Sequence, residues 1–392
     1  MRVVFQRPQL ILTTGFLTGF VFVAVQMCIP LYAKERLGVG GMMLGVYGLS
    51  FNLLLVFLAL AADRIRRGIG FRGAMALGGA VLAAASFLVP WVRRPLWVIA
   101  PCLLWGVAHA LYVPAVLGAN AEGQTPEQIK RGAVWSMIWA ILGQTAGSAV
   151  AGRLYEIRPM APFLACGALA TVAALLTLPR QAMKIAPWRA GAPHRDHAVS
   201  LGRKRTFVRL AFLANFGLCV SVLTVMVLLP EHAQTASLTG LKYGALFSIL
   251  MLGALTSHVS LALWHGWHYS ARFLIGVQAA AAAALIWFSC AESYSQLCAS
   301  QYVIGYALGL TYLSSVYYGM ELGGWNTGHG GRHEAVVGAA MGLGPFLGGA
   351  VIALSGHPRA PFLAAAGLIF LLILMQVRLL PRPSRDEGGN KY

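Results

Sequence analysis

Apolar stretches recur twelve times along the chain, and short polar or turn-forming segments separate them. A membrane-spanning helix needs about 20 consecutive, mostly apolar residues. The pattern therefore predicts an all-α membrane protein with twelve transmembrane helices. These helices are expected at 9–32, 41–62, 73–91, 96–119, 132–152, 160–179, 207–229, 242–264, 272–290, 296–319, 335–355 and 360–379.

The composition agrees with this pattern. Of the 392 residues, 58% are apolar and only 11% are charged. A soluble protein carries roughly 25% charged residues, because its surface faces water. The composition therefore excludes a soluble globular protein, and the high apolar content excludes a disordered chain.

The basic residues indicate how the helices are oriented. The chain has 30 Lys and Arg residues against 12 Asp and Glu, a net charge of +18. Most of the basic residues fall in the even-numbered connections and in the two terminal segments. Cytoplasmic loops carry such an excess, so both termini are expected in the cytoplasm and the plasma (inner) membrane is the expected location. The orientation in the membrane then accounts for the net positive charge, so no nucleic-acid partner is expected.

The longest polar stretch divides the apolar segments into two sets of six. It covers 180–206 and is basic, which suits a cytoplasmic linker lying beside anionic lipid. The prediction is an N-terminal six-helix bundle at 1–179 and a C-terminal bundle with a cytoplasmic tail at 207–392. Two sets of equal size indicate an internal duplication, and a monomer is expected.

The connection after the second stretch carries a recognisable motif. Residues 59–68 read ALAADRIRRG, with Asp63 and Arg64 at the centre. The segment resembles the cytoplasmic signature of the major facilitator superfamily, G-x-x-x-D-R-x-G-R-R. Ala59 and Arg66 stand where the signature has glycine.

Two glycine-rich segments strengthen the resemblance. Residues 143–152 read GQTAGSAVAG, and residues 344–349 read GPFLGG. Both are similar to the antiporter signature of the same superfamily, G-x-x-x-G-P-x-x-G-G, and they fall in the fifth and eleventh stretches, which a six-helix repeat relates. Small residues let helices approach closely. The residues expected to serve helix packing are Gly143, Gly147, Gly152, Gly344, Pro345, Gly348 and Gly349.

The resemblance implies a secondary active transporter that works by alternating access, with the first, fourth, seventh and tenth helices around a central cavity. Proton-coupled export of a small organic solute is the expectation. A lipid or lysolipid flippase on the same fold is the alternative. A membrane enzyme or a sensor without transport is a third possibility, but no catalytic motif supports it, and no cofactor is expected.

Polar side chains at membrane depth usually face protein or a watery cavity. In the four cavity-lining helices the candidates for solute binding are Gln26, His109, Tyr112, Asn215, Tyr302 and Tyr306. Tyr302 and Tyr306 lie one turn apart and are expected to wall the cavity opposite Gln26 and His109. For several of them a hydrogen bond that bridges two helices is the competing interpretation.

Carboxylates are scarce in the apolar stretches. No Asp or Glu falls in the middle of the first nine, which favours a neutral, zwitterionic or anionic solute. The candidates for proton coupling are Glu321, His333 and Glu334, because a histidine beside a glutamate can exchange protons near neutral pH. The alternative is that Glu334 only begins a helix, where a carboxylate complements the helix dipole.

The motif at 59–68 also suggests a cytoplasmic gate. The resemblance implies that Asp63 meets the start of the eleventh helix when the cytoplasmic side is closed, with Arg64, Arg67 and Arg332 taking part. Exposed N–H groups and the positive end of the helix dipole favour a carboxylate there. The alternative is that Asp63 only pairs with neighbouring arginines in water.

Metal binding and disulfides receive little support. His258, His265, His268, His329 and His333 lack the spacing and the cysteine or carboxylate companions of a zinc site, so no metal is expected. The six cysteines form no C-x-x-C pair. Cys290 and Cys298 flank one short loop, and a disulfide between them stays open.

Overall fold

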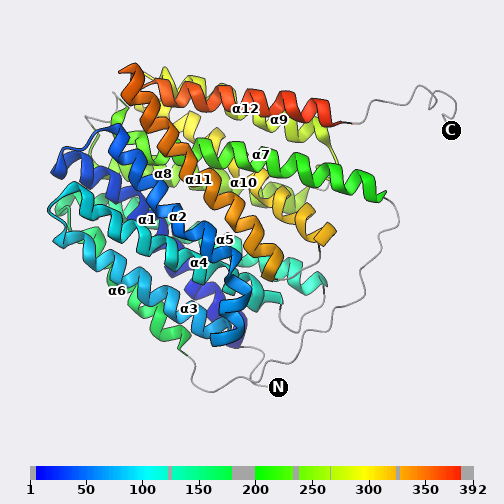
Figure 1. Ribbon diagram of the computed structural model, residues 1–392, viewed down its shortest axis with the longest axis horizontal. Helices are drawn as coiled ribbons and strands as arrows, with labels where there is room; N and C mark the ends of the chain where they lie inside the picture. The colour runs from blue at the N-terminus through cyan, green and yellow to red at the C-terminus, as the bar shows by residue number, and fades with distance from the viewer. Residues whose placement is uncertain are drawn as a thin grey trace.

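The computed structural model describes residues 6–121, 126–178, 199–232, 238–264, 266–323 and 327–380. Within these residues it contains twelve α-helices, three short 3₁₀ helices and no strand (Figure 1). The α-helices are α1 (Gln6–Leu37), α2 (Gly41–Leu60), α3 (Ala62–Leu88), α4 (Ile99–Ala121), α5 (Pro126–Ile157), α6 (Ala161–Thr177), α7 (Leu201–Leu228), α8 (Gly240–Leu263), α9 (Ala271–Ser289), α10 (Tyr294–Gly323), α11 (Thr327–Ser355) and α12 (Ala360–Leu379). The 3₁₀ helices are η1 (Val89–Trp91), η2 (Pro95–Val98) and η3 (Leu229–Glu231).

The prediction of twelve helices in an all-α membrane fold is confirmed. Nine helices in the described ranges are long and apolar enough to cross a bilayer, and α6 is apolar but shorter. Several helices begin earlier than their apolar stretches. The largest differences are at α3, which starts at Ala62 rather than 73, and at α11, which starts at Thr327 rather than 335. Polar and glycine-containing turns continue these helices beyond their apolar parts.

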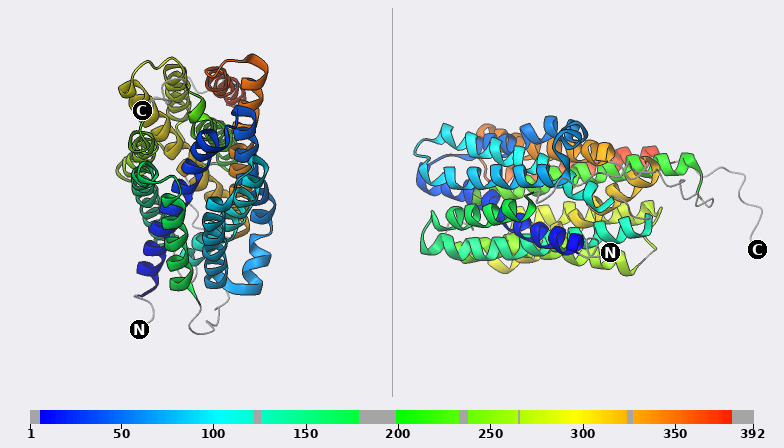
Figure 2. Two further views of the ribbon diagram at one scale, coloured as in Figure 1. Left: turned by 90° about the vertical axis from the view of Figure 1, so that its left-hand side faces the viewer. Right: turned by 90° about the horizontal axis from the view of Figure 1, so that it is seen from below.

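The two six-helix halves lie against each other along their helix axes (Figure 2). We call α1–α6 the N-terminal half and α7–α12 the C-terminal half. The expected linker falls largely at 179–198, outside the described residues, so the boundary at 180–206 stays a prediction. We call the end of the bundle where α1 and α7 begin the linker end, and the other the opposite end.

Small residues bring the helices together in a repeated way. In the N-terminal half, Gly143 and Gly147 of α5 lie against the backbone of Phe16 and Phe20 on α1, so that an added Cβ would clash there. In the C-terminal half, Gly344 of α11 lies against the backbone of Val220 on α7. The same two helices also make contacts between the halves.

Two helix pairs make the most extensive contacts between the halves. On α5, Gly152 packs against Gly240 and Gly244 of α8, and on α11, Gly349 packs against Gly41 of α2. The α2–α11 contact continues to the linker end, where Gly331 lies against Ala59. Pro345 also takes part, since Gly45 and Gly48 of α2 lie against it. Gly348 instead packs within the C-terminal half, against Thr224 and Leu228 of α7 and Pro361 of α12.

Polar contacts close the opposite end. Lys34 Nζ on α1 lies 2.8 Å from Glu231 Oε1 in η3, and this ion pair crosses between the halves. In the contact between α5 and α8, the hydroxyls of Ser148 and Ser248 are 2.9 Å apart. Ser248 Oγ also donates to the Thr145 carbonyl oxygen at 2.8 Å, so an ion pair and serine hydroxyl contacts link the two halves.

One buried polar pair lies away from the interface between the halves. Gln278 on α9 and Gln376 on α12 exchange two hydrogen bonds of 2.9 and 2.7 Å, and both residues are fully buried. Buried amides are stable only when they are hydrogen-bonded. The pair fixes the register between two helices that are otherwise apolar.

Candidate functional site

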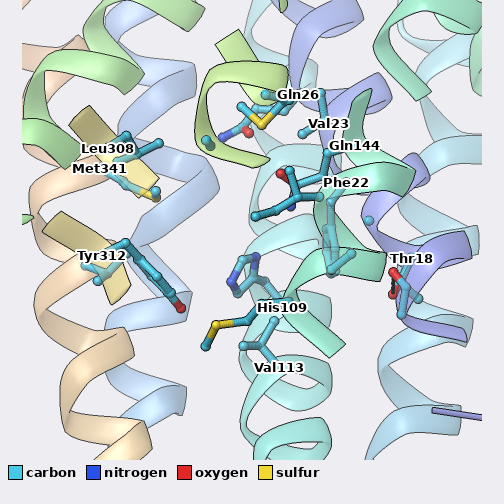
Figure 3. A pocket seen from close by; sticks show the side chains of 18 of the residues that line it. Thr18, Phe22, Val23, Gln26, His109, Val113, Gln144, Leu308, Tyr312 and Met341 are labelled. Carbon is cyan, nitrogen blue, oxygen red and sulfur yellow. Dashed lines mark hydrogen bonds between the residues drawn. The ribbon is translucent and has the colours of Figure 1, made fainter. Parts of the chain in front are cut away.

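A cavity of about 240 Å³ lies between the two halves. It is lined from α1, α4 and α5 on one side and from α7, α8, α10 and α11 on the other. Figure 3 shows Leu308, Tyr312 and Met341 facing Phe22 and His109 across it. The lining thus includes the first, fourth, seventh and tenth helices, as expected, together with α5, α8 and α11.

The N-terminal wall is a cluster of rings. The ring centroid of Phe22 lies 5.1 Å from that of Trp105 and 4.9 Å from that of His109. The Trp105 indole N–H donates to the Phe22 carbonyl oxygen at 3.3 Å, which fixes the indole. Tyr112 stands edge-on to Phe22 at 6.4 Å. The amides of Gln26 and Gln144 complete this wall.

The C-terminal wall carries a carboxylate. Glu334 is 2% exposed, and its Oε1 accepts a hydrogen bond from the Tyr312 hydroxyl at 2.8 Å. The Nδ1 atom of His333 lies 3.2 Å from the same oxygen. Across the cavity, His109 Nε2 lies 3.7 Å from the other oxygen, Oε2. One carboxylate therefore faces three protonatable groups, two from its own half and one from the other.

His333 is held on both sides of its ring. Its Nε2 lies 2.8 Å from Ser315 Oγ on α10, while its Nδ1 faces Glu334. If Nδ1 donates to the carboxylate, the neutral ring accepts from Ser315 at Nε2, and the protonated ring donates at both positions. The serine hydroxyl can serve either state because it both donates and accepts.

The position of Glu334 corrects two expectations. It lies about two turns inside α11, because that helix starts at Thr327, so Glu334 does not begin a helix. Since it lines the cavity, the cavity does contain a carboxylate. A cationic solute is therefore no longer disfavoured.

The structure places Gln26, His109 and Tyr112 on the cavity, but it does not place Tyr302 and Tyr306 there. Tyr302 is 37% exposed, and its hydroxyl lies 2.9 Å from Thr256 Oγ1 on α8. The expectation that these two tyrosines wall the cavity is wrong. Gly305 and Gly309 pack against the backbone of α8, and the two tyrosines lie on the same side of α10 as these glycines. The face with Leu308 and Tyr312 lines the cavity instead.

Two further candidates lie away from the cavity. Asn215 is 1% exposed, and its Oδ1 accepts from Cys219 Sγ at 3.5 Å within α7, so it serves that helix and not the cavity lining. Glu321 lies 2.8 Å from Lys204 Nζ and accepts from the Tyr269 hydroxyl at 2.6 Å. Burial and the Glu321 carboxylate raise the pKa of Tyr269, which keeps this tyrosine a donor.

The gate residues lie at the linker end. Asp63 Oδ2 is 3.2 Å from Arg67 Nη2, and Arg64 and Arg332 are exposed. The start of α11 lies close by, because Gly331 packs against Ala59 just before α3. Gly70 follows with a φ of 71°, which interrupts α3 after the motif. The structure therefore brings Asp63 near α11, and a direct latch between them stays a proposal.

Several residues that line the cavity are not among the candidates from the sequence. His258 lies inside α8, is 2% exposed, and its Nδ1 is 2.7 Å from the Ala254 carbonyl oxygen. Tyr312 and Gln144 line the cavity as well. The sequence does carry a sign of Tyr312 and His258, because both are polar residues within apolar stretches. The six cysteines are free thiols, which answers the open question about Cys290 and Cys298.

No protein-family model matches the chain, and neither does any curated protein. Solved structures do match. A crystal structure of the nucleoside transporter NupG has 16% identity and a TM-score of 0.72 over 95% of this chain and 98% of that one. A mutant of that transporter has 16% identity and a TM-score of 0.70 over 96% and 100%. The chain is therefore a twelve-helix membrane protein with the major facilitator fold, and at this identity the likeness establishes the fold alone.

Proposed function

We propose that the protein is a secondary active transporter that moves a small organic solute by alternating access and couples this movement to protons. The observation that carries the proposal is the buried Glu334 in a cavity between the halves, where His333 and His109 face it. An ionisable side chain at membrane depth is costly and marks a substrate or proton pathway. The fold shared with a nucleoside transporter supports the same conclusion.

The contacts between the halves suit a rocking motion. Glycine and serine contacts between α5 and α8, and between α2 and α11, form close but largely apolar surfaces that can separate. The ion pair between Lys34 and Glu231 would open when the opposite end opens. In the orientation expected from the basic residues, the opposite end faces the outside of the cell.

The size of the cavity supports a small solute. Sites for drug-sized ligands measure about 300–1,000 Å³, and this cavity of about 240 Å³ lies just below that range. A whole lipid would not fit in it. We therefore favour solute transport over a flippase, and export as its direction because the sequence around Gly143 and Gly147 is similar to the antiporter signature.

Reconstitution into liposomes tests the proposal. A thermal-shift panel of small organic solutes, with nucleosides included because of the structural neighbour, first identifies a ligand. A pH-sensitive dye inside the liposomes then reports protons, and labelled ligand reports flux. We expect proton movement only when ligand is added, and its loss in Glu334→Gln but not in Glu321→Gln.

The contrary outcomes are equally specific. Ligand flux without proton movement would contradict proton coupling but would support solute transport. Lipid flipping without any solute, measured with a labelled lipid, would replace the proposal with the flippase.

A further inference from the structure

The charges that line the cavity are unbalanced. Among the described residues that line it, Glu334 is the one carboxylate, and no Lys or Arg joins it. The nearest groups that can carry positive charge are His109 and His333, and each does so only after it takes up a proton. With neutral histidines the site therefore holds one negative charge.

A buried charge that nothing compensates is very costly. Hydrogen bonds from Tyr312 and from neutral His333 stabilise the carboxylate, but they do not cancel its charge. Each stable state of the cavity therefore needs one positive charge beside Glu334. A proton held by the cluster supplies it when the cavity is empty, and a solute that displaces this proton has to bring the charge itself.

The wall opposite the carboxylate suits a cation with an apolar body. Phe22, Trp105 and Tyr112 place three aromatic rings there. The negative faces of aromatic rings attract ammonium groups, most strongly where water is excluded. Met226, Met251 and Met341 supply soft apolar surface on the remaining sides.

We propose that the cavity binds a monovalent organic cation, an ammonium group on an apolar body, in exchange for one proton. This rests on the proposed transport function and names its solute class. The proton leaves the His109–His333–Glu334 cluster for water on the side from which the cation enters, so the charge of the cavity does not change. The exchange is one for one and electrically neutral.

Other titratable groups face Glu334 from the packed helices. Tyr312 on α10 donates to it, and the Cys219 thiol on α7 lies within reach of its charge. On α8, His258 lines the same cavity, where its Nδ1 faces the Ala254 carbonyl. Tyrosine and thiol groups stay neutral between about pH 5 and 8, so the histidines and Glu334 carry the exchange.

A pair of matched probes tests the charge requirement. Benzyltrimethylammonium and neopentylbenzene have nearly the same shape, but only the first is charged. We expect calorimetry on the full-length protein in detergent to show that the cation binds and releases close to one proton, measured in buffers of different ionisation enthalpy. Its affinity should rise by up to about tenfold per pH unit between about pH 5 and 8. The neutral probe should bind at least about tenfold more weakly, with no proton release.

Two variants locate the effect. Glu334→Gln keeps the size of the side chain and should reduce affinity for the cation to that for neopentylbenzene, without pH dependence. Glu321→Gln makes the same change at a carboxylate outside the cavity and should bind as the parent does. Proton release in the parent needs no variant, so it decides the question even if Glu334→Gln fails to fold.

The outcomes separate this inference from the transport function. Equal affinity for the two probes, or no heat from the cation up to millimolar concentration, overturns the cation site. If neutral solutes still drive proton-coupled flux in liposomes, the transporter stands without it. If the cation binds and a proton is released, but no flux is seen in liposomes, the cation site is supported and the proposed transport function is contradicted.

Discussion

The helices α5 and α11 pack in the same manner but carry different chemistry. Each packs small residues against the first helix of its own half, with Gly147 at Phe20 on α1 and Gly344 at Val220 on α7. Each then reaches the other half, α5 at α8 and α11 at α2. The packing has been repeated in both halves.

The chemistry has not been repeated. In the part of α11 before Gly344 lie His333 and Glu334. The part of α5 that lines the cavity contributes the uncharged polar residues Ser136 and Gln144. Under the proposed transport function, both halves need close backbone contacts to rock against each other, whereas one carboxylate is enough to exchange one proton. The two halves are therefore alike in their glycine packing but differ in the charged residues that line the cavity.

Removing the charge should have the largest effect. We expect Glu334→Gln to reduce solute-driven proton movement to the level of protein-free liposomes. Adding Gln144→Glu to this variant moves a carboxylate to α5, where Tyr312 and His333 do not hold it, and should not restore the movement. Restored movement would show that the site works equally well from either half.

Filling the repeated contacts should cost a similar amount in both halves. Gly147→Ala and Gly344→Ala each place a methyl group against a neighbouring backbone carbonyl, and overpacking of this kind costs about 1–3 kcal/mol of stability. Thermal unfolding in detergent measures it. The controls are Gly276→Ala and Gly367→Ala, where a Cβ meets nothing within 4 Å and helix propensity favours alanine by up to about 1 kcal/mol. A large difference between Gly147→Ala and Gly344→Ala would mean that the contacts are not equivalent.

The contact that crosses the cavity should matter less than the charge itself. His109 Nε2 is 3.7 Å from Glu334, longer than a hydrogen bond, so we expect His109→Gln to weaken coupling by about fivefold, or about 1 kcal/mol. The ratio of proton to solute movement measures this. His333→Asn, which also loses the Ser315 contact, should have the greater effect. The reverse order would make the N-terminal half the main holder of the proton.

The gate should show the smallest effect. Asp63 is 34% exposed, so its attraction to the start of α11 is screened and worth about 0.3–1 kcal/mol. We expect Asp63→Asn to raise the access of thiol reagents from the linker end by about fivefold at most. Arg67→Ala removes the neighbouring ion pair alone and serves as the comparison. Equal access in Asp63→Asn and the parent would leave the latch without support.

The sequence predicts the fold well because hydrocarbon sets a strict minimum length for each helix. Twelve apolar stretches became twelve helices, and α8, α9 and α12 begin within two residues of their predicted starts. The weak point was a helix whose first turns are polar. The apolar pattern predicts a connection before 335 and so places Glu334 at the start of a helix, whereas Glu334 lies inside α11.

The site was only partly predictable for a related reason. Apolar periodicity shows that Tyr302, Tyr306 and Tyr312 lie on α10, but apolar residues occur on all sides of this helix, so it does not show which side meets the cavity. Gly305 and Gly309 decide this by fixing the face that meets α8. The approach of His109 to Glu334 joins residues far apart in the chain, and only the assembled fold brings them together.

The amide pair of Gln278 and Gln376 has a consequence for biosynthesis. The two residues are 98 positions apart, so α9 leaves the ribosome well before α12. Until then Gln278 has only the bond from its Nε2 to the Leu274 carbonyl oxygen within α9, and an amide oxygen left unpaired in hydrocarbon costs free energy. The arrival of the last helix satisfies both side chains at once and secures the register of α9. A chain truncated before Gln376 should therefore be retained at the insertion machinery or degraded, even though every helix of the cavity is already present.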